Sequence, residues 1–247
     1  MGYHGLSEQW LKRRAGDLHW RLIARAMGQR DAVFICPDGE PLYAAFCATS
    51  LKIFEPDAPR LGGNLVLSSD LYRVGHGRLA SCVEIAAEDR IIGRMVLVSA
   101  FVGRTVPESN RSIVRRSPKA LAMPPEADIS IKRIAGVAAT LARSALQKGP
   151  GHLVGTRRQD LLPCPATDFN AAGLLYFPSF SALADRALFQ SGERDCQFIT
   201  SRQVIYLGNV EPGEWIGIGL RKISRGYDVF LHGSDDRPLA LMRARFR

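Results

Sequence analysis

The sequence predicts an α+β fold, in which helices and strands occupy separate stretches of the chain instead of alternating. The first observation is a helical region near the N-terminus that is followed by four or five strand-like segments. The second is that residues 168–247 repeat this order, with a loop, an apolar helix and several strands. At 247 residues, 46% of them hydrophobic and 23% charged, the chain can also bury a substantial core. Two similar globular halves are therefore expected.

The first half opens with two predicted helical pieces that Gly16 separates. Ser7 can cap the first piece, Glu8 stands favourably at its positive end, and Asp17 can cap the second piece. Strand-like segments follow, and residues 37–39 (PDG) predict a hairpin turn. We expect strands at residues 32–35, 42–50, 64–74, 78–86 and 91–103, the last of them apolar enough to be buried on both faces.

The composition changes after residue 104, where a basic and proline-containing stretch begins. It predicts a first domain at residues 1–104, a linker at 105–150 and a second domain at 151–247. Within the linker, residues 129–147 predict an amphipathic helix. Its apolar face would carry Ile134, Val137, Ala138 and Leu141.

The second half is organised around residues 168–190, DFNAAGLLYFPSFSALADRALFQ. Pro178 suits the first helical position, because its missing N–H costs nothing there. The amides of Ser179 and Phe180 should then be unpaired and electropositive. An apolar stripe follows, made of Phe180, Leu183, Ala184, Ala187 and Leu188. Further strands are expected at 196–208, 215–224, 227–232 and 239–246.

A net charge of +9 makes the surface attractive to anions. The phosphates of coenzyme A and the acidic surface of a carrier protein suit this charge. Nucleic acid is not expected as a partner, because no nucleic-acid-binding motif accompanies the charge. No apolar run reaches the length of a membrane span, and no secretory signal is recognisable, so we expect a cytoplasmic protein without a membrane partner.

The five cysteines form no C-x-x-C pair, which argues against a zinc site or a disulfide framework. We expect them to be reduced and packed in the core. They are Cys36, Cys47, Cys82, Cys164 and Cys196.

Several stretches resemble a known family. DFNAAGLLYFPSFSALAD with the following SRQVIYLGNVEPGEW looks like the helix and next strands of a hot-dog thioesterase-type domain. GLSEQWLKRRAGDLHW with GEPLYAAFCATSLKI is similar to the leinamycin-pathway bifunctional acyltransferase/decarboxylase family. The resemblance covers residues 5–103 and 168–247. It implies a double hot-dog fold, with two antiparallel sheets that each wrap round a central helix.

The resemblance also implies a chemistry. Family members act in polyketide-like biosynthesis on acyl-CoA of the malonyl or methylmalonyl type and deliver the acyl group to an acyl carrier protein. No separate cofactor is implied, since coenzyme A is part of the substrate, and a homodimer is one compatible assembly. The family's proposed nucleophilic tyrosine corresponds to Tyr43, which would need a neighbour to take its proton. His19 is the candidate neighbour. The structural alternatives are a strand residue for Tyr43 and a helix residue packed beside Trp20 for His19.

Negative charge forms on the thioester oxygen in acyl transfer, hydrolysis and decarboxylation, so hydrogen-bond donors should surround that oxygen. Asp168 and Asn170 are candidates to hold a water, a carboxylate or the carbonyl, and Asn170 suits a malonyl-type substrate better because it does not repel a carboxylate. The helix starts at Ser7–Glu8 and Ser179–Phe180 are candidate substrate-binding positions. Asn209 is a further candidate, unless it is simply a turn residue beside Gly208.

The sequence departs from the family at its beginning. Only four residues precede Gly5, where family members carry an opening strand, so we expect a very short strand, a recorded start that is late, or an altered first-half site. Three functions remain as alternatives: acyl transfer with decarboxylation, thioester hydrolysis, and a hot-dog module that binds acyl carriers without catalysis. No H-E-x-x-H, G-x-S-x-G or Walker motif points to another enzyme class.

Overall fold

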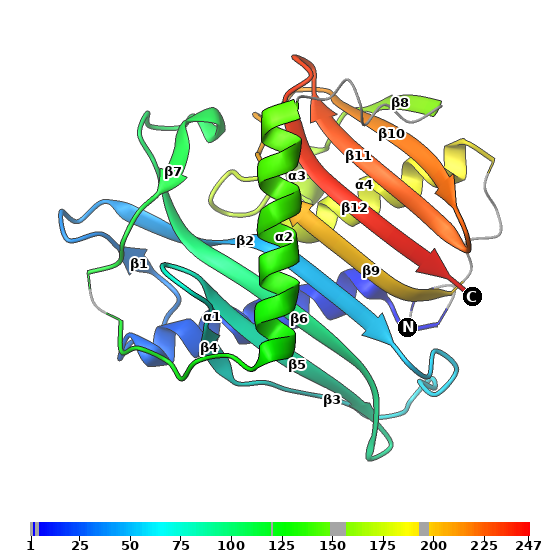
Figure 1. The fold of residues 1–247 in the computed structure, drawn as a ribbon, viewed down its shortest axis with the longest axis horizontal. Helices are drawn as coiled ribbons and strands as arrows, with labels where there is room; N and C mark the ends of the chain where they lie inside the picture. Colours follow the sequence, from blue (N-terminus) through cyan, green and yellow to red (C-terminus); the bar gives the residue numbers. More distant parts are fainter. Residues whose placement is uncertain (1, 3–4, 120, 149–156, 193–197) are drawn as a thin grey trace.

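The computed structural model describes residues 2, 5–119, 121–148, 157–192 and 198–247. Within these residues, twelve strands form one antiparallel sheet, with the helices α1 and α4 on one face and α2 on the other (Figure 1). The first half and its extension consist of α1 (Glu8–Ala26), β1 (Phe34–Ile35), β2 (Pro41–Ile53), β3 (Leu65–Ser68), β4 (Leu71–Arg73), β5 (Leu79–Ala87), β6 (Arg90–Arg104), η1 (Asn110–Ser112), β7 (Ile113–Arg115) and α2 (Ile129–Lys148). The second half consists of β8 (Arg157–Leu161), α3 (Pro165–Asp168), α4 (Phe177–Gln190), β9 (Ile199–Tyr206), β10 (Ile216–Ile223), β11 (Gly226–Gly233) and β12 (Pro238–Phe246).

The two halves join edge to edge through β2 and β9. The strand order is β3-β5-β6-β2-β9-β12-β11-β10-β8, so the two predicted sheets are continuous. β2 pairs with β9 only over residues 48–52 and 201–205, whereas its pairing with β6 extends from residue 43 to 53. A bulge at Cys47 marks the point where β2 leaves β9. The first part of β2 therefore borders a wedge between the two halves.

The central helices α1 and α4 lie side by side and antiparallel on one face of the sheet. α1 packs on the first sheet through residues such as Leu11 and Ala15, and α4 packs on the second. The apolar stripe predicted for α4 is confirmed, because all five of its residues are buried. This arrangement of one helix for each half of an antiparallel sheet is the double hot-dog fold that the resemblance implies.

The predicted break at Gly16 is wrong, since α1 is one continuous helix of 19 residues. Gly16 has a packing role instead. A Cβ atom at this position would lie 2.8 Å from Cε1 of Phe177 on α4. The glycine permits the two central helices to approach closely, which a sequence pattern cannot distinguish from a helix stop.

A buried group of charges links the same two helices. Glu8 lies 2.8 Å from Lys12 and 3.4 Å from Arg202, and Arg202 also binds Asp185 on α4. Lys12 donates to the hydroxyl of Ser181. Burial raises the pKa of Glu8, but Arg202 and Lys12 outweigh this effect and hold that pKa below its usual value. Glu8 is therefore a structural ion-pair partner between the halves.

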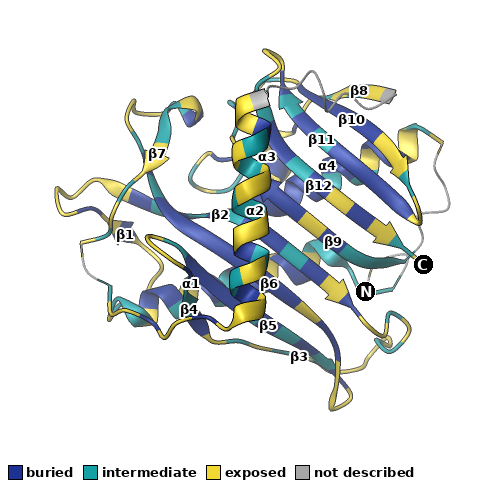
Figure 2. Ribbon diagram, in the orientation of Figure 1, coloured by how far each residue is buried: buried dark blue, intermediate teal, exposed yellow. Residues whose placement is uncertain are grey.

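The third long helix, α2, crosses the opposite face of the sheet. Ile131 and Ala135 are buried against β2, β5 and β6, whereas Val137 and Leu141 are 54% and 47% exposed. Figure 2 shows the exposed residues along the outer side of α2 and the buried residues along the central strands. The helix is as predicted, but Val137 and Leu141 do not lie on its buried face, because small alanines face the sheet instead.

Two strands were not predicted. Residues 113–115 of the predicted linker form β7, which pairs with β6, and β8 is an additional strand of the predicted second domain. Cys36 is buried and Cys47 and Cys82 are half-buried, but Cys164 is exposed at the start of α3, contrary to the prediction. Cys196 lies outside the described residues. Among the helices described, none combines the length and apolar character needed to span a membrane.

Candidate active site

A cavity of about 680 Å³ lies where β2 and β9 separate. Most of its wall is apolar and comes from both halves of the chain, with the ends of β2 and β9, the alanine face of α2 and the start of α4 all contributing. The apolar wall residues include Trp20, Phe34, Phe46, Val98, Ala138, Ala142, Leu175, Phe177 and Phe180. Of the predicted site residues, Tyr43, Asn170, Phe180 and Asn209 also line this cavity.

Asn170 is presented by a tight loop that precedes α4. The loop closes through hydrogen bonds from Asn170 N to Leu174 O, at 2.8 Å, and from Tyr176 N to Asp168 O, at 2.7 Å. Gly173 has a φ of +70°, which permits the turn. The glycine and the Asx-type side chain that the sequence contains here thus produce a hairpin-like loop at the mouth of the wedge.

The side chain of Asn170 has a fixed orientation. Its Oδ1 accepts from Ala172 N and Leu174 N, each at 3.0 Å. An amide oxygen with two backbone donors determines the position of Nδ2. Among the described residues, no acceptor binds Nδ2, so its two N–H groups remain for a ligand in the cavity. The role of Asn170 as a donor to a substrate stays a prediction.

Tyr43 lies on β2 beside Arg104 of β6. Nη1 of Arg104 donates to the Tyr43 hydroxyl oxygen over 3.2 Å, and the guanidinium carbon lies 5.4 Å from the centre of the ring. A guanidinium can only donate, so the phenol oxygen is the acceptor here and its own proton is left to point elsewhere. The same cation would stabilise negative charge on that oxygen.

Arg104 and Asn110 connect Tyr43 to the Asn170 loop, and neither was predicted as a site residue. Nη2 of Arg104 donates to Asn110 Oδ1 and to Ala172 O, both at 2.6 Å. Nδ2 of Asn110 donates to Gly173 O at 2.7 Å and to Val210 O at 2.8 Å. The only sequence signals were a cation that ends the apolar β6 segment and an asparagine in the predicted linker. Their partners are about 60 to 100 residues away in the chain.

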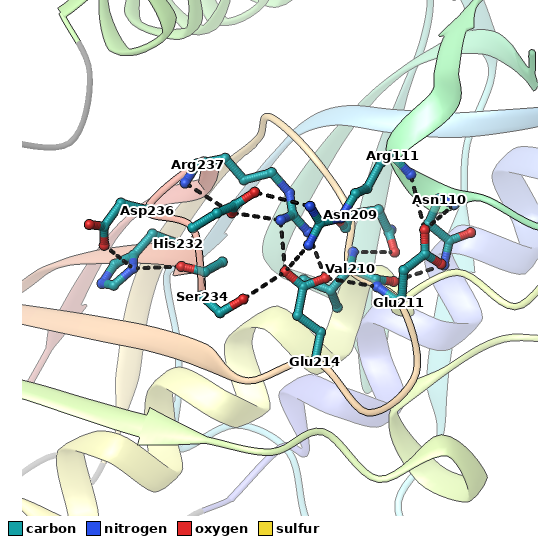
Figure 3. A network of polar contacts seen from close by, with 12 residues as sticks. Asn110, Arg111, Asn209, Val210, Glu211, Glu214, His232, Ser234, Asp236 and Arg237 are labelled. Carbon is teal, nitrogen blue, oxygen red and sulfur yellow. Dashed lines mark hydrogen bonds and ion pairs between the residues drawn. The ribbon is translucent and has the colours of Figure 1, made fainter. Parts of the chain in front are cut away.

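The second half holds Asn110 through the polar network in Figure 3. Glu211 Oε1 accepts from Asn110 N at 2.7 Å, and Arg111 pairs with Glu214 at 3.0 Å. Arg237 also binds Glu214, and its Nη2 donates to Asn209 O. Burial raises the pKa of Glu214, but Arg237 and Arg111 hold it below its usual value. The segment that carries Asn110 is thus tied to the loop after β9 by charge-assisted hydrogen bonds.

Asn209 has a structural role within this loop. Its Oδ1 accepts from Leu175 N at 2.9 Å and Val210 N at 3.0 Å, and its Nδ2 donates to Leu175 O at 3.4 Å. Asn209 therefore lines the cavity, but its side chain forms hydrogen bonds with the backbone of Leu175 and Val210. These contacts agree better with the alternative of a turn residue than with a substrate-binding role for Asn209.

The structure does not bring Asp168 to the cavity. Its carboxylate accepts from Cys164 N at 2.8 Å and lies 3.7 Å from Arg186, and the residue is 2% exposed. Asp168 is the last residue of α3, and its carboxylate binds the amide before the first residue of that helix. The side chain therefore stabilises α3 and does not reach the wedge.

The amides predicted at the start of α4 also need correction. α4 begins at Phe177, one residue earlier than predicted, so Pro178 is its second residue. Ser179 N then donates to Tyr176 O at 2.8 Å. The ring of Phe180 is buried and contacts Tyr206. The amide of Ser179 is therefore paired with the backbone before α4, whereas the ring contact of Phe180 does not test the prediction for its amide.

The first-half candidates lie elsewhere. Ser7 caps α1 by accepting from Trp10 N, and Glu8 belongs to the buried charge group. The ring nitrogens of His19 lie 2.8 Å from the hydroxyls of Ser81 and Ser99, and burial lowers its pKa to about 3. Among the described contacts none joins His19 to Tyr43, so the expected base for this tyrosine is not in place. His19 is buried between α1 and the sheet, which is close to the structural alternative of a packed helix residue.

Comparisons with known proteins identify the fold. No protein-family profile matches the chain, and no curated protein does. Solved structures do match over the whole chain. The acyl-ACP thioesterase from Bacteroides thetaiotaomicron has a TM-score of 0.65 at 9% identity, with 93% of its own chain covered. The 12:0-ACP thioesterase from Umbellularia californica has a TM-score of 0.68 at 10% identity, with 92% of its chain covered. Identities this low show a shared fold, and this agrees with the double hot-dog prediction.

Proposed function

We propose that this chain is an enzyme that acts on acyl thioesters, with the thioester carbonyl placed between Asn170 and Tyr43. The observation that carries the proposal is the Nδ2 group of Asn170, which is oriented by two backbone amides and has no acceptor among the described residues. It stands on the wall of a largely apolar cavity together with Tyr43. Donors fixed in advance around a developing oxyanion are typically worth about 3 kcal/mol each.

The apolar part of the cavity suits the acyl chain. Its aromatic and alanine residues offer no charged partner, so the chain would be held by hydrophobic contact. The thioester end would lie at the wedge, where both halves of the protein supply polar groups. Acyl-CoA and an acyl carrier protein are the corresponding donors of substrate, and no separate cofactor is required.

Hydrolysis is the reaction that the structural neighbours support, since both are named as thioesterases of acyl-ACP. Water would attack the carbonyl carbon, the carbon–sulfur bond would break, and the thiolate would leave and take a proton. Asn170 would stabilise the oxyanion, and the Tyr43 hydroxyl would donate a hydrogen bond to it.

A second candidate, decarboxylation with or without acyl transfer to a carrier, rests on a different observation. Among the described residues that line the cavity there is no Asp, Glu or His. Loss of carbon dioxide from a malonyl-type thioester breaks a carbon–carbon bond and leaves its electron pair as an enolate, which then takes a proton from water. The step needs donors for the enolate oxygen but no base, and in a transfer the carrier thiol would replace coenzyme A, which leaves as the free thiol. A wall without carboxylates also does not repel the substrate's own carboxylate.

Product analysis tests both candidates. The full chain would be incubated with malonyl-CoA, methylmalonyl-CoA and a series of saturated acyl-CoAs, with and without a holo-acyl carrier protein, followed by mass spectrometry. Free acid as the product would support hydrolysis. Carbon dioxide with a shortened thioester, on coenzyme A or on the carrier, would support the second candidate. Binding without turnover of any of these substrates would contradict the enzyme proposal and leave a carrier-binding module.

A further inference from the structure

Two arginines border the cavity on the side away from the wedge. Arg78 precedes β5, whose first residue, Leu79, pairs with Ser99 of β6. Arg115 ends β7 and pairs with Val102 of the same strand. Both therefore lie along the edge of β6 that faces away from β2, and both belong to the cavity wall.

Neither arginine has an acidic partner among the described residues. Two other arginines of the wall, Arg111 and Arg237, are paired with Glu214 and Asp235. Arg78 also has a buried Nε with no hydrogen-bond partner, whereas Arg115 is exposed. A buried donor without an acceptor is costly, and an anion with several oxygens would satisfy both guanidinium groups.

The positive potential of both groups reaches the cavity interior. Burial raises the pKa of the Cys47 thiol, and Arg78 and Arg115 are the two charges that oppose this rise. Cys47 lies at the bulge of β2, on the cavity wall. Both cations therefore act on this part of the cavity wall from the far edge of β6.

The spacing between the two polar ends is defined by the sheet. Tyr43 of β2 and Arg115 of β7 pair with the same residue of β6, Val102, from its two sides. Two strand spacings, about 10 Å, therefore separate the backbones of Tyr43 and Arg115. An arm that joins a thioester at Tyr43 to an anionic group at the two guanidinium groups would follow this row of residues.

We propose that Arg78 and Arg115 bind the phosphate of the phosphopantetheine arm while the thioester lies at Asn170 and Tyr43. The proposal rests on the proposed action on acyl thioesters, because that action requires a thiol carrier. The phosphate is common to coenzyme A and to a holo-carrier protein, so both carriers would use this site. The arginines would set the depth to which the thioester enters the wedge.

The test is the phosphate dependence of binding. Calorimetry on the full chain would compare 4′-phosphopantetheine with pantetheine, which lacks the phosphate. The wild-type protein should bind the phosphorylated compound at least about tenfold more tightly for each arginine engaged. Arg78→Gln and Arg115→Gln should each remove about tenfold of this preference, and the double variant should bind both compounds alike. Arg245→Gln, at an exposed arginine of β12, is the control for net charge.

Equal binding of the two compounds by the wild-type protein, or a phosphate preference that survives in the double variant, would overturn the proposal. A loss in the variants that depends on a carboxylate in the acyl group, measured with malonyl- against acetyl-pantetheine, would also overturn it and assign the arginines to the acyl end. Coenzyme A and holo-carrier protein as ligands would show which carrier uses the site. Phosphate-dependent binding without turnover of any thioester would support this site while contradicting the proposed enzyme.

Discussion

The guanidinium of Arg104 donates to the hydroxyl oxygen of Tyr43 over 3.2 Å. Through its other nitrogen the same group holds Ala172 O in the loop of Asn170. A single cation from β6 thus sets the relative positions of the two residues on which the proposed chemistry depends. This relationship leads to the first three predictions.

Removal of the Tyr43 hydroxyl should lower turnover without unfolding the protein. We expect Tyr43→Phe to reduce kcat about 10² to 10³-fold, which is the effect of losing one oxyanion donor. The ring remains to pack against Arg104, so the melting temperature should change little. A thiol-release assay and thermal unfolding measure the two effects. If Tyr43 is a nucleophile, trapping by mass spectrometry should find an acyl adduct in the wild type that is missing in Tyr43→Phe, and an adduct on another residue would refute that role.

Asn170→Asp separates the two functions of this side chain. The carboxylate can still accept from Ala172 N and Leu174 N, so the loop should keep its shape, but the two Nδ2 donors are lost. We expect at least a 10²-fold loss of kcat/KM with a nearly unchanged melting temperature. Asn170→Ala, which removes the acceptor as well, should lower both. Full activity in Asn170→Asp would show that Nδ2 does not contact the reacting carbonyl.

Arg104→Lys should preserve the charge but not the geometry. A lysine cannot bind the Tyr43 oxygen, Asn110 Oδ1 and Ala172 O together as the planar guanidinium does. We expect reduced kcat and faster hydrogen exchange at the amides of residues 170–176, which hydrogen–deuterium exchange mass spectrometry can measure. Exchange equal to that of the wild type would show that the loop does not depend on Arg104.

His19 should make the stability of the protein sensitive to acid. Burial lowers its folded-state pKa to about 3 from a reference of 6.5. Above pH 6.5 both the folded and unfolded states carry neutral His19. As the pH falls from there towards 3, only the unfolded state takes up the proton, so this residue removes up to about 1.4 kcal/mol of folding free energy per pH unit. Urea unfolding between pH 7 and 4 should show a shallower decline in His19→Gln than in the wild type. Parallel declines would exclude this role.

Gly16→Ala should destabilise the protein although alanine favours helices. The added Cβ would lie 2.8 Å from the Phe177 ring, and such overpacking typically costs about 1 to 3 kcal/mol. Gly136→Ala in α2 is the matched control. No atom lies within 4 Å of a Cβ placed there, so helix propensity should raise stability by up to about 1 kcal/mol. Chemical denaturation of the two variants should therefore give changes of opposite sign.

Local patterns were sufficient to predict most of the fold. The apolar stripe of α4 and the strands β9 to β12 depend on periodicity within one element, and the structure confirms them. Gly16 could not be interpreted in this way, because its importance comes from Phe177, which lies on another helix. Val137 and Leu141 were assigned to the buried face of α2 for the same reason. Which face of α2 is buried depends on contacts with the cavity and the sheet, and these come from other elements.

The site was predictable only in part for a related reason. Asn170 could be proposed because an asparagine before an apolar helix is a local signal. Arg104 and Asn110 become site residues only when β6 and η1 meet the loop before α4. Asp168 was proposed as a site residue and is only two residues from Asn170. Its carboxylate nevertheless binds the amide of Cys164 at the start of α3 and does not reach the cavity. Sequence proximity does not determine side-chain direction in a tight loop.

The edge-to-edge junction of β2 and β9 has an evolutionary consequence. In a symmetric pair of identical chains, every substitution appears at both ends of such a junction. Here each position occurs once, and the opposite end of the junction carries Phe54, Thr200 and Arg247 around an open groove. A residue such as Tyr43 can therefore be selected at one end without a copy at the other. The covalent joining of the halves frees the second end to diverge independently.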